Sequence, residues 1–287
     1  MRATSIDALL LVDKPAGISS HDVVALVRRA LGTRKVGHGG TLDPFATGLL
    51  VLMTGRGTRL LQFVPAEPKI YDATIRFGTA TDSDDATGAP IEHAELPDPA
   101  AVLAAIPALT GSLQQVPPAY SAKHVDGERA YAMARRGERP ELPAVAVQVD
   151  AWQVLEQGAD FLRARIQCGT GTYIRALARD LGRAVGSVAH LEQLRRVRVG
   201  PFDVADADDI ESLRAGIVRR HPLVASLGAM PRDQLAPDDV RRVRQGMAVP
   251  ASVAGPRAVL LDVDGEVVAI AARRGDEWKP DVVLATA

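Results

Sequence analysis

Residues 36–48 read Val-Gly-His-Gly-Gly-Thr-Leu-Asp-Pro-Phe-Ala-Thr-Gly, and this stretch carries the most information in the chain. It holds one carboxylate, Asp43, among four glycines. Pro44 disfavours helical backbone angles for Asp43, and glycines allow tight turns and close approach of a ligand. A lone acid on such a loop suits a covalent nucleophile, but most glycine-rich loops with one Asp are plain turns. The loop by itself leaves both interpretations open.

Segments of regular structure flank this loop. Residues 8–12 predict a buried strand, and Ser19 with Asp22 predicts a capping box that starts a helix ending at Gly32. Apolar periodicity then predicts the following elements: a buried strand at 49–53, a short helix at 58–64, a half-buried strand at 71–78, a helix at 98–106, strands at 144–156 and 159–167, and a helix at 174–184.

The order of these elements indicates the fold class. Strands and helices do not alternate in regular βαβ units, which favours an α+β fold with a mixed, largely antiparallel sheet and flanking helices. After about residue 230 the pattern changes to a short helix at 238–245 and a hairpin whose turn contains Asp264-Gly265. We therefore predict a domain at 1–230 and a small β-rich domain at 231–287.

Composition limits the function classes. The 287 residues carry a net charge of −1, with 29 Arg and 5 Lys among the basic residues. Arginine suits phosphate recognition, although a base-composition bias of the genome would give the same ratio. One cysteine, no zinc-type spacing, no secretion signal and no apolar stretch near the ~20 residues of a membrane span lead us to expect a cytoplasmic protein.

Three further features have competing interpretations. Asp82, Asp84 and Asp85 could hold Mg²⁺, but a polar turn whose Asp side chains bond their own backbone is the simpler explanation. Arg175 begins a helix, where the macrodipole prefers anions, so we expect it to face a carboxylate or a phosphate. Tyr71 is either a core tyrosine or a platform on which a base stacks.

Together these segments resemble one family. The matching motifs are Lys14-Pro15-x-Gly17-x-Ser19-Ser20, Lys35-Val36-Gly37-His38 with Gly40-Thr41-Leu42-Asp43-Pro44-x-Ala46-Thr47-Gly48, Lys69-Ile70-Tyr71, Thr81-Asp82-x-x-Asp85, Gln115-Val116-Pro117-Pro118, Gly169-Thr170-Gly171-Thr172-Tyr173-Ile174-Arg175 and His190-Leu191-x-x-Leu194-Arg195-Arg196. They are similar to the signatures of the bacterial tRNA pseudouridine-55 synthases, the TruB family. The likeness covers at least residues 8–200, and Gly39 departs from it, since the family usually has Thr or Ser there.

The resemblance implies a function and a site. It implies a pseudouridine synthase fold with a C-terminal PUA-like RNA-binding domain, and isomerisation of the T-loop uridine (U55) of tRNA without cofactor or metal. The partner is the T stem-loop of tRNA, which excludes a membrane role, and we expect a monomer. Asp43 is the implied catalytic residue, and the implied substrate-binding residues are Lys14, His38, Gly40, Thr41, Tyr71, Tyr173, Arg175 and Leu194.

Several points stay open from the sequence. Asp43 could attack C1′, attack C6 or take a proton from C2′ of the ribose. Residues 121–124 read Ser-Ala-Lys-His, where many family members have an aliphatic residue and then Lys, so the role of that lysine falls to Lys123 or to His124. Four arginine runs are candidates to hold the RNA backbone: 28–34, 129–139, 195–198 and 241–244. A tRNA-binding folding chaperone without catalysis is the alternative function.

Overall fold

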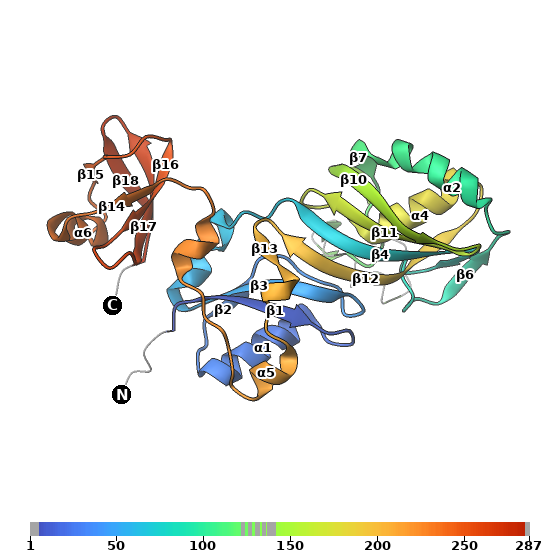
Figure 1. The fold of residues 1–287 in the computed structure, drawn as a ribbon, viewed down its shortest axis with the longest axis horizontal. Helices are drawn as coiled ribbons and strands as arrows, with labels where there is room; N and C mark the ends of the chain where they lie inside the picture. Colours follow the sequence, from blue (N-terminus) through green and yellow to red (C-terminus); the bar gives the residue numbers. More distant parts are fainter. Residues whose placement is uncertain are drawn as a thin grey trace. The chain divides into compact units, whose positions relative to one another are not determined.

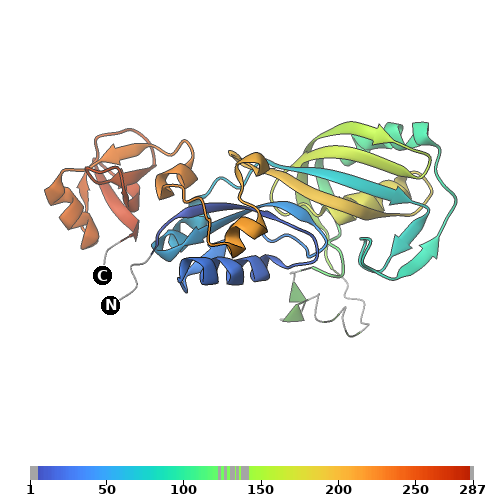
Figure 2. The same ribbon diagram turned by 60° about the horizontal axis from the view of Figure 1, so that its bottom comes forward.

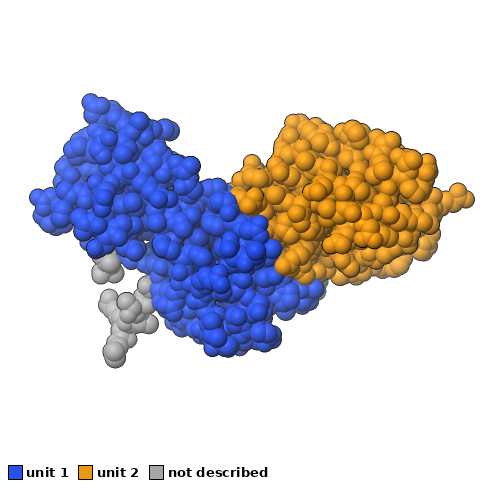
Figure 3. All heavy atoms as spheres, in the orientation of Figure 1, with its two compact units in different colours: residues 1–44, 49–65, 201–287 blue, residues 45–48, 66–200 orange. Residues whose placement is uncertain are grey.

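The computed structural model describes residues 6–121, 124–125, 128–129, 133, 136 and 142–284. The chain divides into two compact units, each described by itself below (Figure 3). The first comprises residues 1–44, 49–65 and 201–287, and the second comprises residues 45–48 and 66–200.

The amino-terminal part of the first unit packs α-helices against a small group of strands (Figures 1 and 2). Its elements are β1 (Leu9–Lys14), α1 (Ser20–Leu31), β2 (Val36–His38), β3 (Thr47–Thr54), the 3₁₀ helix η1 (Gly55–Phe63), β13 (Phe202–Asp203), the 3₁₀ helix η3 (Val204–Asp206), α5 (Ile210–Arg214) and the 3₁₀ helix η4 (Leu223–Leu227). The capping box at Ser19 and Asp22 is confirmed, and Gly32 ends α1 in the left-handed conformation at φ 60°. Valines at 23, 24 and 27 form the stripe of α1 that meets Leu10 and Leu50 in one apolar core.

The carboxyl-terminal part of the first unit is the predicted β-rich segment. Its elements are β14 (Arg232–Gln234), α6 (Pro237–Arg244), β15 (Val249–Pro250), β16 (Arg257–Leu261), β17 (Val267–Arg274) and β18 (Glu277–Val283), with the strand order β14-β16-β17-β18-β15. The predicted hairpin is confirmed as β16 and β17, and Gly265 in its turn has φ 79°. The side chain of Trp278 is fully buried in the core of this sheet.

The second unit is built on an antiparallel sheet. Its elements are β4 (Lys69–Phe77), β5 (Thr79–Thr81), β6 (Pro90–His93), α2 (Pro99–Ala105), the 3₁₀ helix η2 (Ile106–Leu109), β7 (Gly111–Gln115), β8 (His124–Val125), β9 (Glu128–Arg129), β10 (Val145–Gln157), β11 (Phe161–Cys168), α4 (Ile174–Ala184) and β12 (Ala189–Val199). The strands run in the order β12-β4-β11-β10-β7, and the largely antiparallel α+β fold is confirmed. The alternation in β4 is regular, with every second side chain buried from Lys69 to Phe77.

Strand β12 was not predicted, although it pairs with β4 along most of its length. Its buried residues include Leu191, Leu194 and Arg196, and the first two are separated by three positions instead of two. The register shifts between Leu191 and Gln193 and again between Arg196 and Arg198. Each bulge breaks the period of two, and a buried arginine removes an apolar residue from the pattern, so the strand has no simple sequence signature.

Gly48 permits a close approach between β3 and β12. It has φ +102°, and a Cβ atom there would lie 2.2 Å from the carbonyl oxygen and 2.7 Å from the amide nitrogen of Arg196. The pairing of Thr47 with Arg195 and of Gly48 with Arg196 is parallel. Only glycine fits this backbone angle without strain, and only glycine leaves room for the neighbouring backbone.

We expect Gly48→Ala to lower the free energy of unfolding by about 2–6 kcal/mol, since backbone strain and overpacking each cost about 1–3 kcal/mol. Gly111→Ala is the matched control, because Gly111 has φ +95° but a Cβ atom there would meet nothing within 4 Å. Urea unfolding of both variants separates strain from steric overlap. Equal losses in the two variants would show that the approach to Arg196 does not constrain position 48.

Asp233 is a buried carboxylate in the C-terminal sheet. Its Oδ2 accepts hydrogen bonds from the indole Nε1 of Trp278 at 2.7 Å and from the backbone N–H of Ser252 at 2.8 Å, and its Oδ1 accepts the Ser252 hydroxyl at 2.5 Å. Burial alone raises the pKa of Asp233, but the hydrogen bonds from Ser252 and Trp278 outweigh it and hold this pKa below its usual value of 3.8. The ionised form therefore stabilises the fold.

This sign predicts how stability depends on pH. Because the folded pKa of Asp233 is depressed, its contribution is present above the unfolded pKa near 3.8 and is lost as pH falls through the folded value. We expect Asp233→Asn to cost about 1–3 kcal/mol at pH 7, with the difference from wild type shrinking below pH 3.8. Trp278 fluorescence in a Trp152→Phe background, which leaves one tryptophan, follows this unfolding. A difference that stays constant down to pH 2 would contradict the assignment.

Candidate active site

The loop that carries Asp43 connects β2 to β3. The N–H of Gly39 donates to the carbonyl oxygen of Val51 at 2.9 Å, which continues the β2–β3 ladder by one residue. Gly40 then turns the chain at φ 124°. A Cβ atom at Gly39 would meet nothing closer than 3.7 Å, so the structure has room for the Thr or Ser that the family usually places there.

Ser20 and Lys14 hold the loop from inside the first unit. The Ser20 hydroxyl accepts the N–H of Leu42 at 2.9 Å and donates to the Leu42 carbonyl oxygen at 3.1 Å. The fully buried ammonium group of Lys14 donates to the carbonyl oxygens of Pro15, Ile18 and Pro44 at 2.8–3.2 Å. Since an ammonium has three donors, Lys14 fixes the backbone on the carboxyl side of Asp43.

The predicted site residues on the Asp43 loop itself are only partly enclosed. Asp43, His38 and Gly40 are half-buried, and Thr41 is exposed. Asp43 stands four residues before Thr47. Thr47 and Gly48, at the start of β3, belong to the second unit and pair with β12. The loop that carries Asp43 is thus anchored to regular structure on both sides.

In the second unit, Arg175 faces the carboxylate of Asp85, and a carboxylate is one of the two kinds of partner, carboxylate or phosphate, expected from its position at a helix start. Its Nη1 lies 3.5 Å from Oδ2 of Asp85 and donates to the carbonyl oxygen of Ser83 at 2.9 Å, while Nη2 donates to the carbonyl oxygen of Tyr120 at 2.8 Å. The side chains of Arg175 and Asp85 are each about 5% exposed. A buried pair with such neighbours has one fixed orientation, which positions the guanidinium group.

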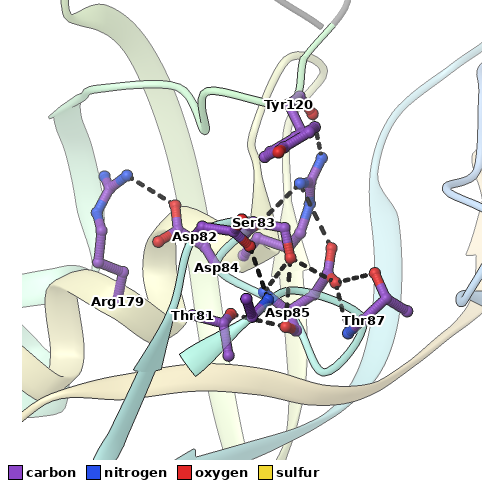
Figure 4. Close-up of polar contacts among 10 residues, drawn as sticks. Thr81, Asp82, Ser83, Asp84, Asp85, Thr87, Tyr120 and Arg179 are labelled. Carbon is purple, nitrogen blue, oxygen red and sulfur yellow. Dashed lines mark hydrogen bonds and ion pairs between the residues drawn. The ribbon is translucent and has the colours of Figure 1, made fainter. Parts of the chain in front are cut away.

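The acidic turn at 81–88 is the other half of this network (Figure 4). Asp85 Oδ1 accepts the Ser83 hydroxyl at 2.8 Å, and the hydroxyl and N–H of Thr87 at 2.6 and 2.9 Å. Asp84 has φ 59°, and its Oδ2 lies 3.0 Å from Nη1 of Arg179. Arg179 follows Arg175 by one turn of α4. Burial raises the pKa of Asp84, an effect that the charge of Arg179 opposes.

These contacts decide between the two interpretations of Asp82, Asp84 and Asp85. Each carboxylate has protein partners, and Asp82 accepts the N–H of Ala89 at 2.9 Å. Across the described residues, no three His, Cys, Asp or Glu side chains form a group suited to a metal ion. The turn is an ordered anchor for α4, and the magnesium interpretation has no support there.

Other predicted residues line the strands and the helix start nearby in the second unit. Tyr71 on β4 is 7% exposed and pairs with Arg196 of β12, and Leu194 on β12 is 8% exposed. Tyr173 precedes α4, and its N–H and carbonyl oxygen are both bonded by the buried amide of Gln115 at 2.9 and 3.1 Å. The structure thus brings Tyr71 and Leu194 onto adjacent strands and gives Arg175 a fixed helix start.

Sequence reasoning missed the roles of Asp85 and Gln115. Both lie within motifs that the family resemblance covers, so the motif positions were the available signal, but their partners at 175 and 173 could not be read from spacing. Lys123 lies outside the described residues, as does the side chain of His124, so that choice stays open. Burial raises the pKa of the single thiol, Cys168, to about 11, which makes it unreactive at neutral pH.

Comparison with known proteins identifies the family of this chain. Residues 28–174 match the model of the TruB family pseudouridylate synthases (N-terminal domain), and residues 175–232 match that of the tRNA pseudouridylate synthase B C-terminal domain. The chain belongs to the TruB family. The tRNA pseudouridine synthase B of Thermobifida fusca (strain YX) is 46% identical to this TruB family member over 97% of its chain and 99% of the relative, and that of Leifsonia xyli subsp. xyli (strain CTCB07) is 46% identical over 94% and 93%.

Solved structures support the fold of this TruB family member. A chain in the structure of an H/ACA RNP bound to a substrate RNA containing 2′-deoxyuridine matches with a TM-score of 0.72 and 20% identity, over 97% of this chain and 85% of that one. At this identity the likeness concerns the fold. In the described part of the chain, none of the helices has the length and apolar character needed to cross a membrane.

Proposed function

We propose that this chain isomerises uridine 55 in the T-loop of tRNA to pseudouridine, with Asp43 as the catalytic nucleophile. The observation that carries the proposal is the Asp43 loop, which matches the family signature and is fixed by Ser20 and Lys14. Relatives named tRNA pseudouridine synthase B that align along nearly the whole chain support the same activity.

The reaction breaks the N1–C1′ bond, turns the uracil and forms a C5–C1′ bond. Atoms and oxidation state balance within the nucleotide, so an ionised carboxylate can begin the reaction by attack on C1′, by attack on C6 or by deprotonation of C2′. A carboxylate whose loop is held by hydrogen bonds on both sides loses little entropy at this step. The supporting geometry is compatible with all three routes.

Tyr71 and Arg175 serve the two remaining needs of the reaction. The detached uracil must be held while it turns, and stacking on an aromatic ring such as Tyr71 is worth roughly 1–3 kcal/mol. Arg175 supplies the positive charge that keeps the catalytic carboxylate ionised, and Asp85 orients Arg175. Leu194 and Tyr173 complete the apolar wall around the base, while Lys14 acts through the backbone of Pro44.

Access to the uridine requires base flipping, at a cost of a few kcal/mol. His38, Gly40 and Thr41 lie on the loop that would enter the T-loop, and His38 would fill the vacated stack. Residues 1–230 would serve as the catalytic domain and residues 231–287 as a PUA-like RNA-binding domain. We propose that the enzyme acts in the cytoplasm as a monomer without a cofactor.

The decisive experiment is tritium release from an unmodified tRNA transcript carrying [5-³H]uridine, followed by mapping of pseudouridine. We expect release of one equivalent per tRNA from position 55 alone, undiminished by EDTA. Tight tRNA binding without tritium release would instead support the alternative of a folding chaperone. Product at another position would overturn the assignment of the T-loop.

A further inference from the structure

The four arginine runs predicted to hold RNA differ in the structure. On α6, Arg241 pairs with Asp238 and Arg242 with Asp239, so two of these charges are neutralised within the helix. On β12, the side chain of Arg196 is 1% exposed, so it cannot contact RNA at the surface. Most of the run at 129–139 lies outside the described residues.

The arginines at 28–34 are exposed and are not engaged in ion pairs among the described residues. Arg28, Arg29 and Arg34 are exposed and line one pocket of about 420 Å³ together with Ala25, Gly32 and Thr33. Among the described residues, none of these three guanidinium groups makes an ion pair or a hydrogen bond. By contrast, other arginines of the same unit are engaged, such as Arg56 with Asp7 and Arg214 with Glu211.

The helix end does not need these side chains. Gly32 and Thr33 donate their N–H groups to the carbonyl oxygens of Arg29 and Arg28 at 3.4 and 3.2 Å, so backbone bonds cap α1. The macrodipole favours cations in the last turn by about 0.3–1 kcal/mol each, which explains Arg28 and Arg29. It does not explain Arg34, which follows the last helical residue by three positions.

We propose that Arg28, Arg29 and Arg34 form a binding site for backbone phosphates of the tRNA. Three cations that line one pocket and have no acidic partner among the described residues repel one another, and a bound phosphate removes that repulsion. Guanidinium forks match phosphate oxygens in bidentate geometry. Such contacts fix the position of an RNA without reading its sequence. The site lies in the segment leading into β2 and the Asp43 loop, so it would hold the RNA while that loop engages the uridine.

The identity of the RNA rests on the proposed function, so binding is measured apart from catalysis. In an Asp43→Asn background, the variant Arg28→Gln/Arg29→Gln/Arg34→Gln is expected to bind full-length tRNA transcript about 10- to 100-fold more weakly at 0.1 M salt. The slope of log affinity against log salt should fall by about 1–2. Arg34→Gln alone, outside the helix, should give an intermediate loss without affecting folding.

The matched control removes the same charge from the same unit. Arg214→Gln/Arg219→Gln/Arg220→Gln changes exposed arginines, two of which already have acidic partners, and should cost less than 3-fold. Equal losses of tRNA affinity in the two triple variants would overturn the site. Unchanged tRNA affinity in the Arg28/Arg29/Arg34 variant would also overturn it, even if the wild-type protein binds inorganic phosphate. With Asp43 intact, KM should rise while kcat at saturating tRNA is kept. If the wild-type protein made no pseudouridine but the triple variant still lost tRNA affinity, the phosphate site would stand and the proposed activity would be rejected.

Discussion

Asp43→Asn is expected to reduce pseudouridine formation by roughly 10⁴- to 10⁶-fold, the loss typical of removing a nucleophile. The amide has nearly the shape of the carboxylate, so Ser20 and Lys14 should hold the loop unchanged. It lacks the negative charge that each of the three routes requires. Single-turnover tritium release from [5-³H]uridine tRNA measures the loss, and equilibrium binding of the same tRNA should stay within about 3-fold.

Two controls accompany this measurement. Mass spectrometry excludes deamidation of the substituted asparagine back to aspartate, which would restore activity in part of the sample. Asp82→Asn tests an exposed aspartate that accepts one turn hydrogen bond, and it should retain nearly full turnover. Full activity of Asp43→Asn in a sample free of deamidation would reject Asp43 as the catalytic residue.

Arg175→Ala is expected to have the second-largest effect. Removing one member of a buried pair leaves Asp85 uncompensated, at a cost of about 3–5 kcal/mol in the free energy of unfolding. Turnover should fall about 10²- to 10³-fold because, in the proposed function, Arg175 supplies the positive charge that keeps the catalytic carboxylate ionised, whereas tRNA affinity should change little. Single-turnover rates and tRNA binding, both at a temperature where the variant is folded, separate these effects.

The matched control is Arg179→Ala on the same helix. It breaks a similar contact of the same turn, with Asp84 at 3.0 Å, so it should destabilise the protein while largely keeping turnover. Arg175→Ala/Asp85→Asn should regain stability relative to Arg175→Ala but not activity. Equal losses of turnover and tRNA affinity in Arg175→Ala would mean that Arg175 is mainly a phosphate contact.

Local patterns predicted much of the fold. The capping box and Gly32 bound α1, alternation identified β4, and the helix predicted at 174–184 has the bounds of α4. These signals depend on neighbours a few residues away, which the sequence displays directly. The same reasoning missed β12, because its two bulges and the buried Arg196 depend on how β4 and Gly48 pack against it.

The family and the candidate catalytic loop can be read from the amino-acid sequence, since the Asp43 motif is contiguous and its residue types suit the proposed chemistry. The partners of the charged side chains emerge only in the folded chain. Folding pairs Arg175 with Asp85 instead of leaving the acidic turn as a metal site, neutralises arginines of α6, and leaves those at 28–34 without an acidic partner among the described residues. The physical reason is that charge pairing depends on which side chains meet through space, and residues 85 and 175 meet only because the folded second unit brings the turn against α4.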